Sequence, residues 1–354
     1  MAKNNYKVLG VMSGTSLDGI DLAECFFVLS EEGIWNYRMG VAETIPYDEI
    51  WESRLREAVH FSKGRLATLD KEYTEYLGGI IRGFVDKNQI TRLDAVCSHG
   101  HTILHQPEKG VTLQIGNLPE IAKWAGQKVV CDFRVQDVAL GGQGAPLVPM
   151  GDRLLFGDYD YCLNLGGFGN CSFEKGEERM AYDICPVNIV LNRYAQQMGC
   201  PYDDRGALAS EGVVQEDVLH QLNALEFYKQ SAPKSLGLEW VQKRVFPILT
   251  ASGSTPKDIL ATFTEHVAIQ LESQFREGTS VLVTGGGAYN DFLLERIRFH
   301  KDVNMVVPEA QLLEFKEALV FGLLGVLKLR DKINCLASVT GASRDHSSGV
   351  VFMD

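Results

Sequence analysis

Short apolar runs and longer segments of helical periodicity alternate along the chain. Four apolar runs predict buried strands, at residues 6–12, 22–28, 94–98 and 129–133. Between the first two runs lies a polar segment punctuated by glycine, which is typical of a turn. Residues 48–88 carry apolar side chains at helical spacing, with a break near Ser62-Lys63-Gly64, so we expect two helices there. Strands that alternate with helices predict an α/β fold.

The second half of the chain opens with the same physical unit as the first. Tyr161–Leu165 predicts a strand, Gly166–Asn170 a turn, and Cys171–Phe173 a returning strand. Further on, an apolar run at residues 280–284 leads into Gly285-Gly286-Gly287. Helices are expected at about 187–197, 213–225 and 255–277.

Two glycine hairpins, each opening one half of the chain, predict two similar lobes that face a shared cleft. We expect residues 1–133 to form an N-terminal lobe with the first hairpin, rejoined by the C-terminal segment 334–354. Residues 134–333 would form the second lobe, with the second hairpin and the glycine turn on the adenosine side. No low-complexity linker separates them.

Net charge and cysteine content indicate which binding partners and which cellular compartment to expect for this protein. The 354 residues carry a net charge of −12, which argues against a nucleic-acid or anionic-membrane partner. The eight cysteines include no C-x-x-C pair, as expected for free thiols in a reducing cytoplasm. No apolar run approaches the length of a membrane-spanning helix or of a signal-peptide core. We therefore expect a cytoplasmic protein.

The first turn, Gly14-Thr15-Ser16-Leu17-Asp18-Gly19, combines close backbone N–H groups with two hydroxyls and one carboxylate. Glycine lets backbone approach a phosphate, hydroxyls donate to its oxygens, and a carboxylate can hold a hydrated Mg²⁺. The segment is not a Walker A loop. An ordinary tight hairpin remains the alternative interpretation.

Two other glycine-rich segments suit a ligand site. Gly285-Gly286-Gly287 follows a predicted strand and precedes a helix, so it can lie against a nucleotide, or can simply be a strand–helix connection. Residues 132–137 run into 141–149, a polar and then glycine-rich stretch. That stretch suits a segment lining a cleft, or a long surface loop.

Asp183 follows the strand-like Met180-Ala181-Tyr182 and precedes a predicted helix. A carboxylate in this place can act as a general base. It can equally be the N-cap of the helix that starts near Pro186. Pattern alone leaves both interpretations open.

Three histidines, His99, His101 and His105, form an H-x-H-x3-H pattern. No carboxylate or thiol cluster completes a metal site around them. We expect His99 to be a hydrogen-bonding residue at a strand end.

Several motifs together resemble the anhydro-N-acetylmuramic acid kinase family, and they occur in order over essentially the whole chain. They are residues 10–21, Ser98-His99-Gly100, Gln114–Asn117, Asp132-Phe133-Arg134, residues 141–149, Asn164–Gly167, Val283–Ala288 and Ser338–Arg344. The resemblance implies a two-lobed actin-like (ribonuclease H-like) fold with ATP and a sugar in an interlobe cleft. A homodimer is compatible with it.

The resemblance also implies a reaction and its residues. The family converts 1,6-anhydro-N-acetylmuramic acid, ATP and water to N-acetylmuramic acid 6-phosphate and ADP, in peptidoglycan recycling. Asp183 matches the general base, and Glu317 matches a glutamate near the sugar. We expect the sugar to contact Arg134, Asp137, Gln143, Gly144, Asn188 and Glu317. We expect ATP to contact Gly14, Thr15, Ser16, Leu17, Asp18, Gly19, Ile20, Asp21, Gly166, Gly167, Asn170, Gly285, Gly286 and Gly287, with Mg²⁺ held by Asp18 through water.

One departure concerns the segment after Asp183. The family usually has glycines where this chain has Cys185 and Val187, and these side chains could narrow the sugar pocket or reshape the turn. Two alternatives therefore stay open: a kinase for a different, levoglucosan-like 1,6-anhydrosugar, and a non-catalytic nucleotide-binding protein of the actin/Hsp70-like group. A glycoside hydrolase would leave the phosphate turns unexplained.

Overall fold

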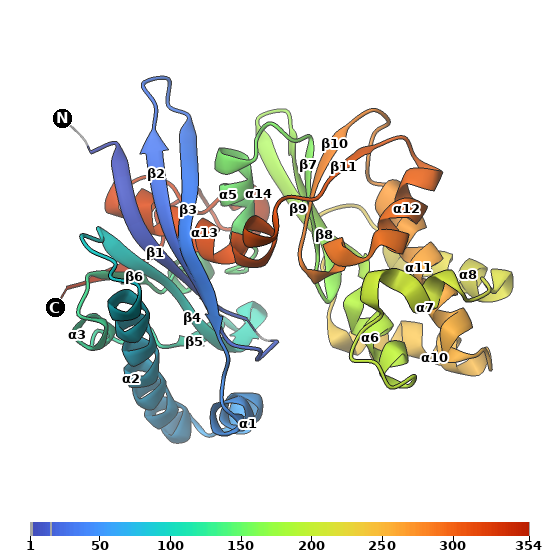
Figure 1. Cartoon of the computed structure of the whole chain (residues 1–354), viewed down its shortest axis with the longest axis horizontal. Coiled ribbons are helices and arrows are strands. Elements are labelled where there is room, and N and C mark those ends of the chain that lie inside the picture. The colour runs from blue at the N-terminus through green and yellow to red at the C-terminus, as the bar shows by residue number, and fades with distance from the viewer. Residues whose placement is uncertain (1–2, 15, 354) are drawn as a thin grey trace. The chain divides into compact units, whose positions relative to one another are not determined.

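The computed structural model describes residues 3–14 and 16–353 (Figure 1). Contacts within the chain divide it into two compact units. Unit 1 comprises the chain up to Leu155 and the segment from Phe315 onward, and unit 2 is Phe156–Glu314. Each unit has its own sheet and its own helices.

Unit 1 is built on a seven-stranded sheet with the strand order β12-β6-β4-β1-β2-β3, and β5 pairs with β4. Its strands are β1 (Asn5–Ser13), β2 (Ile20–Leu29), β3 (Trp35–Ile45), β4 (Ala95–Gln106), β5 (Val111–Ile115), β6 (Val129–Cys131) and β12 (Val350–Phe352). Its helices are α1 (Glu49–Glu57), α2 (Lys63–Lys87), α3 (Ile121–Ala125), α4 (Val135–Ala139), α5 (Val148–Leu155), α14 (Ala337–Thr340) and the part of α13 (Ala310–Leu329) that starts at Phe315. The two helices expected within residues 48–88 are confirmed as α1 and α2, and Ser62 caps the second.

Strand β1 is buried on both faces because helices cover both sides of the sheet. Leu9 and Val11 join an apolar cluster with α2 residues such as Tyr73. Gly10, between these two residues, points to the opposite face of the strand and faces α13. A Cβ added there would lie 1.9 Å from the carbonyl oxygen of Ala318. Only glycine allows this close approach of helix to strand.

Unit 2 is built on a five-stranded sheet with the order β11-β10-β7-β8-β9. Its strands are β7 (Tyr161–Leu165), β8 (Phe168–Lys175), β9 (Glu178–Pro186), β10 (Ser280–Thr284) and β11 (Asn304–Val306). Its helices are α6 (Asn188–Gln196), α7 (Ala207–Ser210), α8 (Glu216–Asn223), α9 (Leu238–Trp240), α10 (Phe246–Ala251), α11 (Pro256–Glu272) and α12 (Asp291–His300). The core joins the sheet to α11, whose Phe263, Val267 and Leu271 are fully buried.

The two sheets share one five-strand topology. In unit 1, β1 is antiparallel to β2, β2 to β3, and β1, β4 and β6 are parallel. In unit 2, β7, β8 and β9 repeat the antiparallel part, and β7, β10 and β11 repeat the parallel part. Both units thus have the ribonuclease H-like arrangement of actin-like proteins, and the prediction of two units with one topology is confirmed.

The boundaries between the units lie at 155/156 and 314/315, whereas the sequence suggested 133/134 and 333/334. Residues 134–155 belong to unit 1 because the backbone N–H of Gln143 donates to Thr340 and Asp137 accepts from the Thr340 hydroxyl. Helix α13 changes unit at Phe315, where its backbone leaves helical geometry (φ −110°, ψ 15°).

Among the described residues, no helix is both long enough and apolar enough to cross a membrane.

Candidate active site

The first candidate phosphate turn joins β1 to β2 in unit 1. Thr15, predicted to bind ATP, lies outside the described residues. Ser16 and Asp18 are exposed, and the Ser16 hydroxyl donates to Asp18 Oδ1 over 2.6 Å. Asp21 follows in β2 and accepts a hydrogen bond from the Thr44 hydroxyl at 2.6 Å. Ile20, predicted as a binding residue, is fully buried, so only its backbone is suited to meet a ligand.

Asp18 has the properties expected of a carboxylate that could hold Mg²⁺ through water. Its side chain is exposed and Oδ1 is oriented by Ser16. Mg²⁺ usually keeps several waters and is held by one or two carboxylates together with substrate phosphates. A single exposed carboxylate on a candidate phosphate turn is compatible with that pattern.

Arg134 is held in place between two acceptors of unit 1. It lies between β6 and α4, its Nε donates to His99 Nε2 over 2.7 Å, and its Nη1 donates to the Gly144 carbonyl over 2.6 Å. Because His99 Nδ1 lies 3.0 Å from the Gly100 carbonyl, which can only accept, the proton is on Nδ1 and Nε2 is the acceptor. Burial, and secondly the charge of Arg134, lower the pKa of His99 well below its usual value. The imidazole is therefore neutral.

Glu317 lies on α13 near the Arg134 guanidinium. Its side chain is exposed, yet the surrounding protein reduces its hydration and raises its pKa, which Arg134 opposes and Asp21 reinforces. Burial lowers the pKa of Arg134 to about 10, and the charge of Glu317 opposes this change. The structure thus brings Arg134 and Glu317, which are far apart in sequence, into one electrostatic group.

Asp137 is fully buried and organises the glycine-rich loop that follows α4. Its Oδ2 accepts from the Gly144 backbone N–H at 2.7 Å, and its Oδ1 accepts from the Thr340 hydroxyl at 2.7 Å. Gln143 is exposed on that loop. Asp137 therefore positions the loop, whereas Gln143 is accessible to a ligand.

The second candidate phosphate turn, in unit 2, is tighter than expected. The sequence suggested a turn over Gly166–Asn170, but β8 already begins at Phe168, so the turn consists of Gly166 and Gly167. Asn170 lies within the β7–β8 ladder, opposite Asn164. The start of α6 returns to this turn, because the backbone N–H of Asn188 donates to the Gly166 carbonyl.

Asp183 lies within β9, with Asn170 of β8 as its cross-strand neighbour. Its Oδ2 accepts from the Leu236 backbone N–H at 2.8 Å. Helix α6 begins at Asn188, and its N-cap residue, Val187, makes no side-chain capping bond. The N-cap interpretation of Asp183 is therefore wrong. Burial raises the pKa of the Asp183 carboxyl, and the hydrogen bond from Leu236 opposes this rise.

Cys185 and Val187, the two departures from the family pattern, are both fully buried in the hydrophobic core of unit 2. Val187 packs near Gly169, where an added Cβ would lie 3.2 Å from the valine side chain. These side chains occupy core space beneath the turn. The expectation that they narrow the sugar pocket receives no support from this placement.

The triple-glycine turn follows β10 and lies against β7. Gly285 has φ +80°, and an added Cβ would lie 2.6 Å from Asn164 Oδ1. An added Cβ on Gly287 would lie 2.7 Å from the Leu165 side chain, so this position has no room for a side chain either. Gly286 differs because it is exposed, and its added Cβ would meet only the Asn188 amide, at 4.0 Å. Asn188 Nδ2 donates to the Leu165 carbonyl, so Asn188 links this turn to the Gly166-Gly167 turn.

Within each unit, then, most of the predicted residues lie near one another. Unit 1 groups Arg134, Asp137 and Gly144, with Glu317 close to Arg134. Unit 2 groups Gly166, Asn188 and Gly285–Gly287, with Asn170 beside Asp183. Sequence reasoning missed the partners that orient them, namely Thr340 for Asp137 and Leu236 for Asp183. These contacts join distant segments, and no local pattern marks them.

Two units of the same ribonuclease H-like topology, each opening with a glycine hairpin, define a protein of the actin-like class. The comparisons with known proteins narrow this class. Residues 6–354 match the family model described as "Anhydro-N-acetylmuramic acid kinase". The chain belongs to this family.

Relatives named anhydro-N-acetylmuramic acid kinase cover nearly the whole chain. The protein from Azorhizobium caulinodans is 33% identical, over 98% of this chain and 99% of its own. That from Mannheimia succiniciproducens is 32% identical, over 99% and 100%. Among solved structures, an activator of 2-hydroxyisocaproyl-CoA dehydratase from Clostridium difficile with bound ADPNP has a TM-score of 0.42 at 12% identity, over 92% of this chain and 96% of its own. A ligand-bound xylulose kinase from Lactobacillus acidophilus has a TM-score of 0.42 at 11% identity, over 99% and 94%.

Proposed function

We propose that this protein uses ATP to convert 1,6-anhydro-N-acetylmuramic acid and water to N-acetylmuramic acid 6-phosphate and ADP, in peptidoglycan recycling. The observation that carries the proposal is Asp183. Its carboxylate is half-buried, is oriented through Oδ2 by the Leu236 N–H, and caps no helix. Oδ1 has no hydrogen-bond partner among the described residues and is the atom suited to accept a proton from water.

The chemistry follows from one deprotonation. Asp183 accepts a proton from water as the water oxygen bonds to C1 of the sugar, and the C1–O6 bond breaks. O6 keeps that electron pair and attacks the γ-phosphorus of ATP, and the bond from phosphorus to the ADP oxygen breaks. The raised pKa of Asp183 makes it a stronger base than a free aspartate. Ring opening thus supplies the nucleophile for phosphoryl transfer.

The residues of each unit suit separate parts of this reaction. The two glycine turns offer backbone N–H groups to phosphates, and Asp18 would hold Mg²⁺, which neutralises the developing charge on the phosphates. The open side of Gly286 gives room for the nucleotide. Arg134 and Glu317 would orient the sugar, and Gln143 and Asn188 would add hydrogen bonds.

We place the reaction in the cytoplasm, where ATP is available. All eight cysteines are free and seven of them are buried, which fits a reducing compartment.

The test is sugar-dependent release of ADP with MgATP. We expect turnover with 1,6-anhydro-N-acetylmuramic acid and at least about 100-fold lower kcat/KM with 1,6-anhydroglucose, because binding energy from the lactyl and acetamido groups assists catalysis. Comparable turnover of both sugars would favour the levoglucosan-like alternative. ATP binding without ADP release on adding either sugar would favour the non-catalytic alternative.

A further inference from the structure

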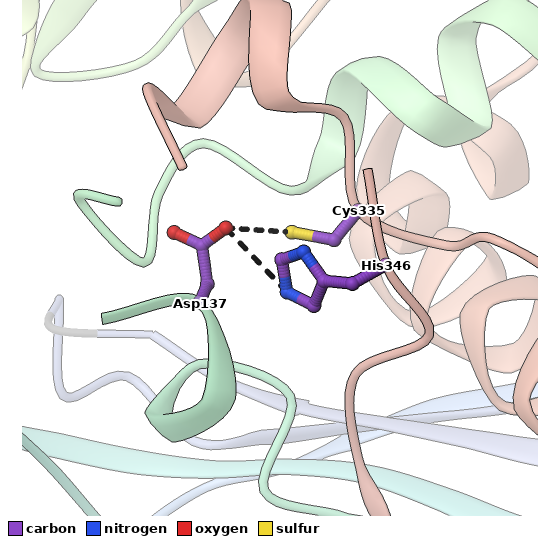
Figure 2. Close-up of side chains that lie close together, drawn as sticks. All are labelled: Asp137, Cys335 and His346. Carbon is purple, nitrogen blue, oxygen red and sulfur yellow. Dashed lines mark hydrogen bonds and ion pairs between the residues drawn. The ribbon is translucent and has the colours of Figure 1, made fainter. Parts of the chain in front are cut away.

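Three side chains with metal-ligating atoms converge in the interior of unit 1. They are Asp137 on α4, Cys335 after α13, and His346 before β12 (Figure 2). Their ligand atoms all lie within 4.8 Å of one another. Asp137 Oδ1 is 3.2 Å from Cys335 Sγ and 3.6 Å from His346 Nε2. All three residues are buried, with exposed fractions of 0%, 1% and 6% in that order.

The orientation of His346 is the second observation. Its Nδ1 lies 3.2 Å from the Arg344 carbonyl oxygen, which can only accept, so Nδ1 carries a proton. The other ring nitrogen, Nε2, is buried and has no hydrogen-bond partner within the described part of the chain. It faces the Asp137 carboxylate, so two acceptors would oppose each other unless a proton or a metal cation lies between them.

The carboxylate is already oriented for ligation. Thr340 Oγ1 donates to Oδ1 and the Gly144 N–H donates to Oδ2, each over 2.7 Å. Hydrogen bonds of this kind fix the orientation of metal ligands in known sites. The backbones of Cys335 and His346 also pair with each other as an isolated antiparallel bridge, which holds their side chains in register.

The ligand set selects the metal. One thiolate, one imidazole and one carboxylate suit Zn²⁺, and tetrahedral Zn–S and Zn–N/O bonds of about 2.3 and 2.0 Å place ligand atoms about 3.3–3.6 Å apart. The distances from Oδ1, 3.2 Å to Cys335 Sγ and 3.6 Å to His346 Nε2, each differ by about 0.3 Å from those of an ideal tetrahedron. Zinc with one carboxylate and one thiolate is electrically neutral, which suits a buried site.

We propose that Asp137, Cys335 and His346 bind one zinc ion, with the fourth position left to a small ligand such as water. The ion would tie α4 and the glycine-rich loop to the C-terminal segment of the chain. Burial, above all, raises the pKa of the Cys335 thiol, and Arg134 opposes this rise, so zinc has to displace the thiol proton. The alternative is a buried imidazolium–carboxylate ion pair with a neutral thiol beside it.

Cobalt and zinc titrations of the wild-type chain distinguish the zinc site from the buried ion pair. After treatment with a chelator and desalting, added Co²⁺ should give a thiolate-to-cobalt charge-transfer absorption and intense tetrahedral visible bands. About one equivalent of Zn²⁺ per chain should abolish both. The ion-pair alternative gives no charge-transfer band. If folded wild-type protein shows no such band after Co²⁺ is added, the zinc proposal is overturned without any variant.

Matched variants locate the site. Cys335→Ser and His346→Gln should each lower zinc affinity at least ~100-fold, because loss of a supporting residue alone already costs 10–100-fold. Cys200→Ser and His105→Gln, which change the same residue types outside the cluster, should bind zinc as the wild type does. Zinc should raise the unfolding midpoint of the wild type and of these controls only. Unchanged zinc affinity in folded Cys335→Ser would overturn the assignment.

Discussion

The Asp183 carboxylate accepts a hydrogen bond from the Leu236 backbone, and a second bond joins the Asp183 backbone to the same segment of unit 2. Leu236 N donates to Asp183 Oδ2 over 2.8 Å, and the Asp183 N–H donates to the carbonyl of Lys234 over 3.1 Å. The pair ties β9 to residues 234–236 and fixes the direction of the carboxylate. A carboxylate held by a single N–H, with its other oxygen available, is arranged for proton transfer rather than for helix capping.

Replacing Asp183 by asparagine should remove turnover while both substrates still bind. The amide oxygen can still accept from Leu236, but the side chain can no longer take a proton from water. We expect kcat to fall by about 10²–10⁴-fold, the usual contribution of a general base. Steady-state kinetics and binding calorimetry with ATP separate the two effects.

Asp258→Asn is the matched control for this experiment. Asp258 also accepts a hydrogen bond from the backbone of a distant segment, with 2.8 Å between its Oδ1 and Val213 N. Its loss should cost stability at most and leave kcat near that of the wild type. Near-normal turnover in folded Asp183→Asn would exclude Asp183 as the base.

The pH dependence should show an acidic limb set by Asp183. Only the ionised carboxylate can accept a proton, and burial raises its pKa. The value of kcat/KM should therefore fall as the pH decreases through that raised pKa, at higher pH than the value of about 3.9 for free aspartate would give. Since the pKa of Glu317 is raised as well, the profile should also be recorded for Glu317→Gln. A limb that disappears in Glu317→Gln would assign it to the glutamate instead.

Gly286→Val should fold normally and lose affinity for ATP. An added Cβ meets no protein atom closer than 4.0 Å, and we expect the valine side chain to extend into the space proposed for the nucleotide. We expect the Kd for ATP to rise at least ~10-fold, with the melting temperature nearly unchanged. Gly83→Val, at another glycine whose surroundings are open, should leave the Kd unchanged. A wild-type Kd in Gly286→Val would remove this turn from the ATP site.

His99→Leu should weaken sugar binding through Arg134. Arg134 Nε would lose its acceptor at 2.7 Å, and an unsatisfied buried donor costs roughly 1–3 kcal/mol. We expect KM for the sugar to rise about 5- to 100-fold while KM for ATP changes little. His99→Gln, which offers an amide oxygen to Arg134, should restore most of the affinity. If His99→Gln fails to rescue, or if both KM values rise equally, His99 has only a structural role.

The sequence predicted strongly patterned elements well and weakly patterned ones poorly. Continuous apolar runs marked β1, β2 and β7, and helical spacing marked α2. Strand β3 was missed because it is an edge strand in which most side chains are partly exposed. The unit boundaries were misplaced because the attachment of residues 134–155 depends on contacts with Thr340, nearly 200 residues away.

The candidate site was predicted through its glycine turns and motif residues, whereas its supporting contacts were not. Asp183, Arg134 and His99 stand in recognisable motifs, and His99 was expected to form hydrogen bonds. No pattern showed, however, that His99 orients Arg134 or that Leu236 orients Asp183. The Asp137–Cys335–His346 cluster was likewise not predicted, since Asp137 is separated from Cys335 and His346 by about 200 residues and the three form no spacing motif. Sequence patterns therefore identify the turns that carry candidate site residues, and only the fold shows which other residues orient their side chains.

The most direct test of the proposed reaction is to identify the product. The protein is mixed with MgATP and 1,6-anhydro-N-acetylmuramic acid, and the products are analysed by phosphorus NMR and mass spectrometry. The account predicts equimolar ADP and a sugar that has gained one water and one phosphoryl group, with phosphorus coupled to the C6 protons and a free anomeric centre. Phosphorylation with the anhydro ring intact, ring opening without phosphorylation, or an unchanged sugar would contradict it.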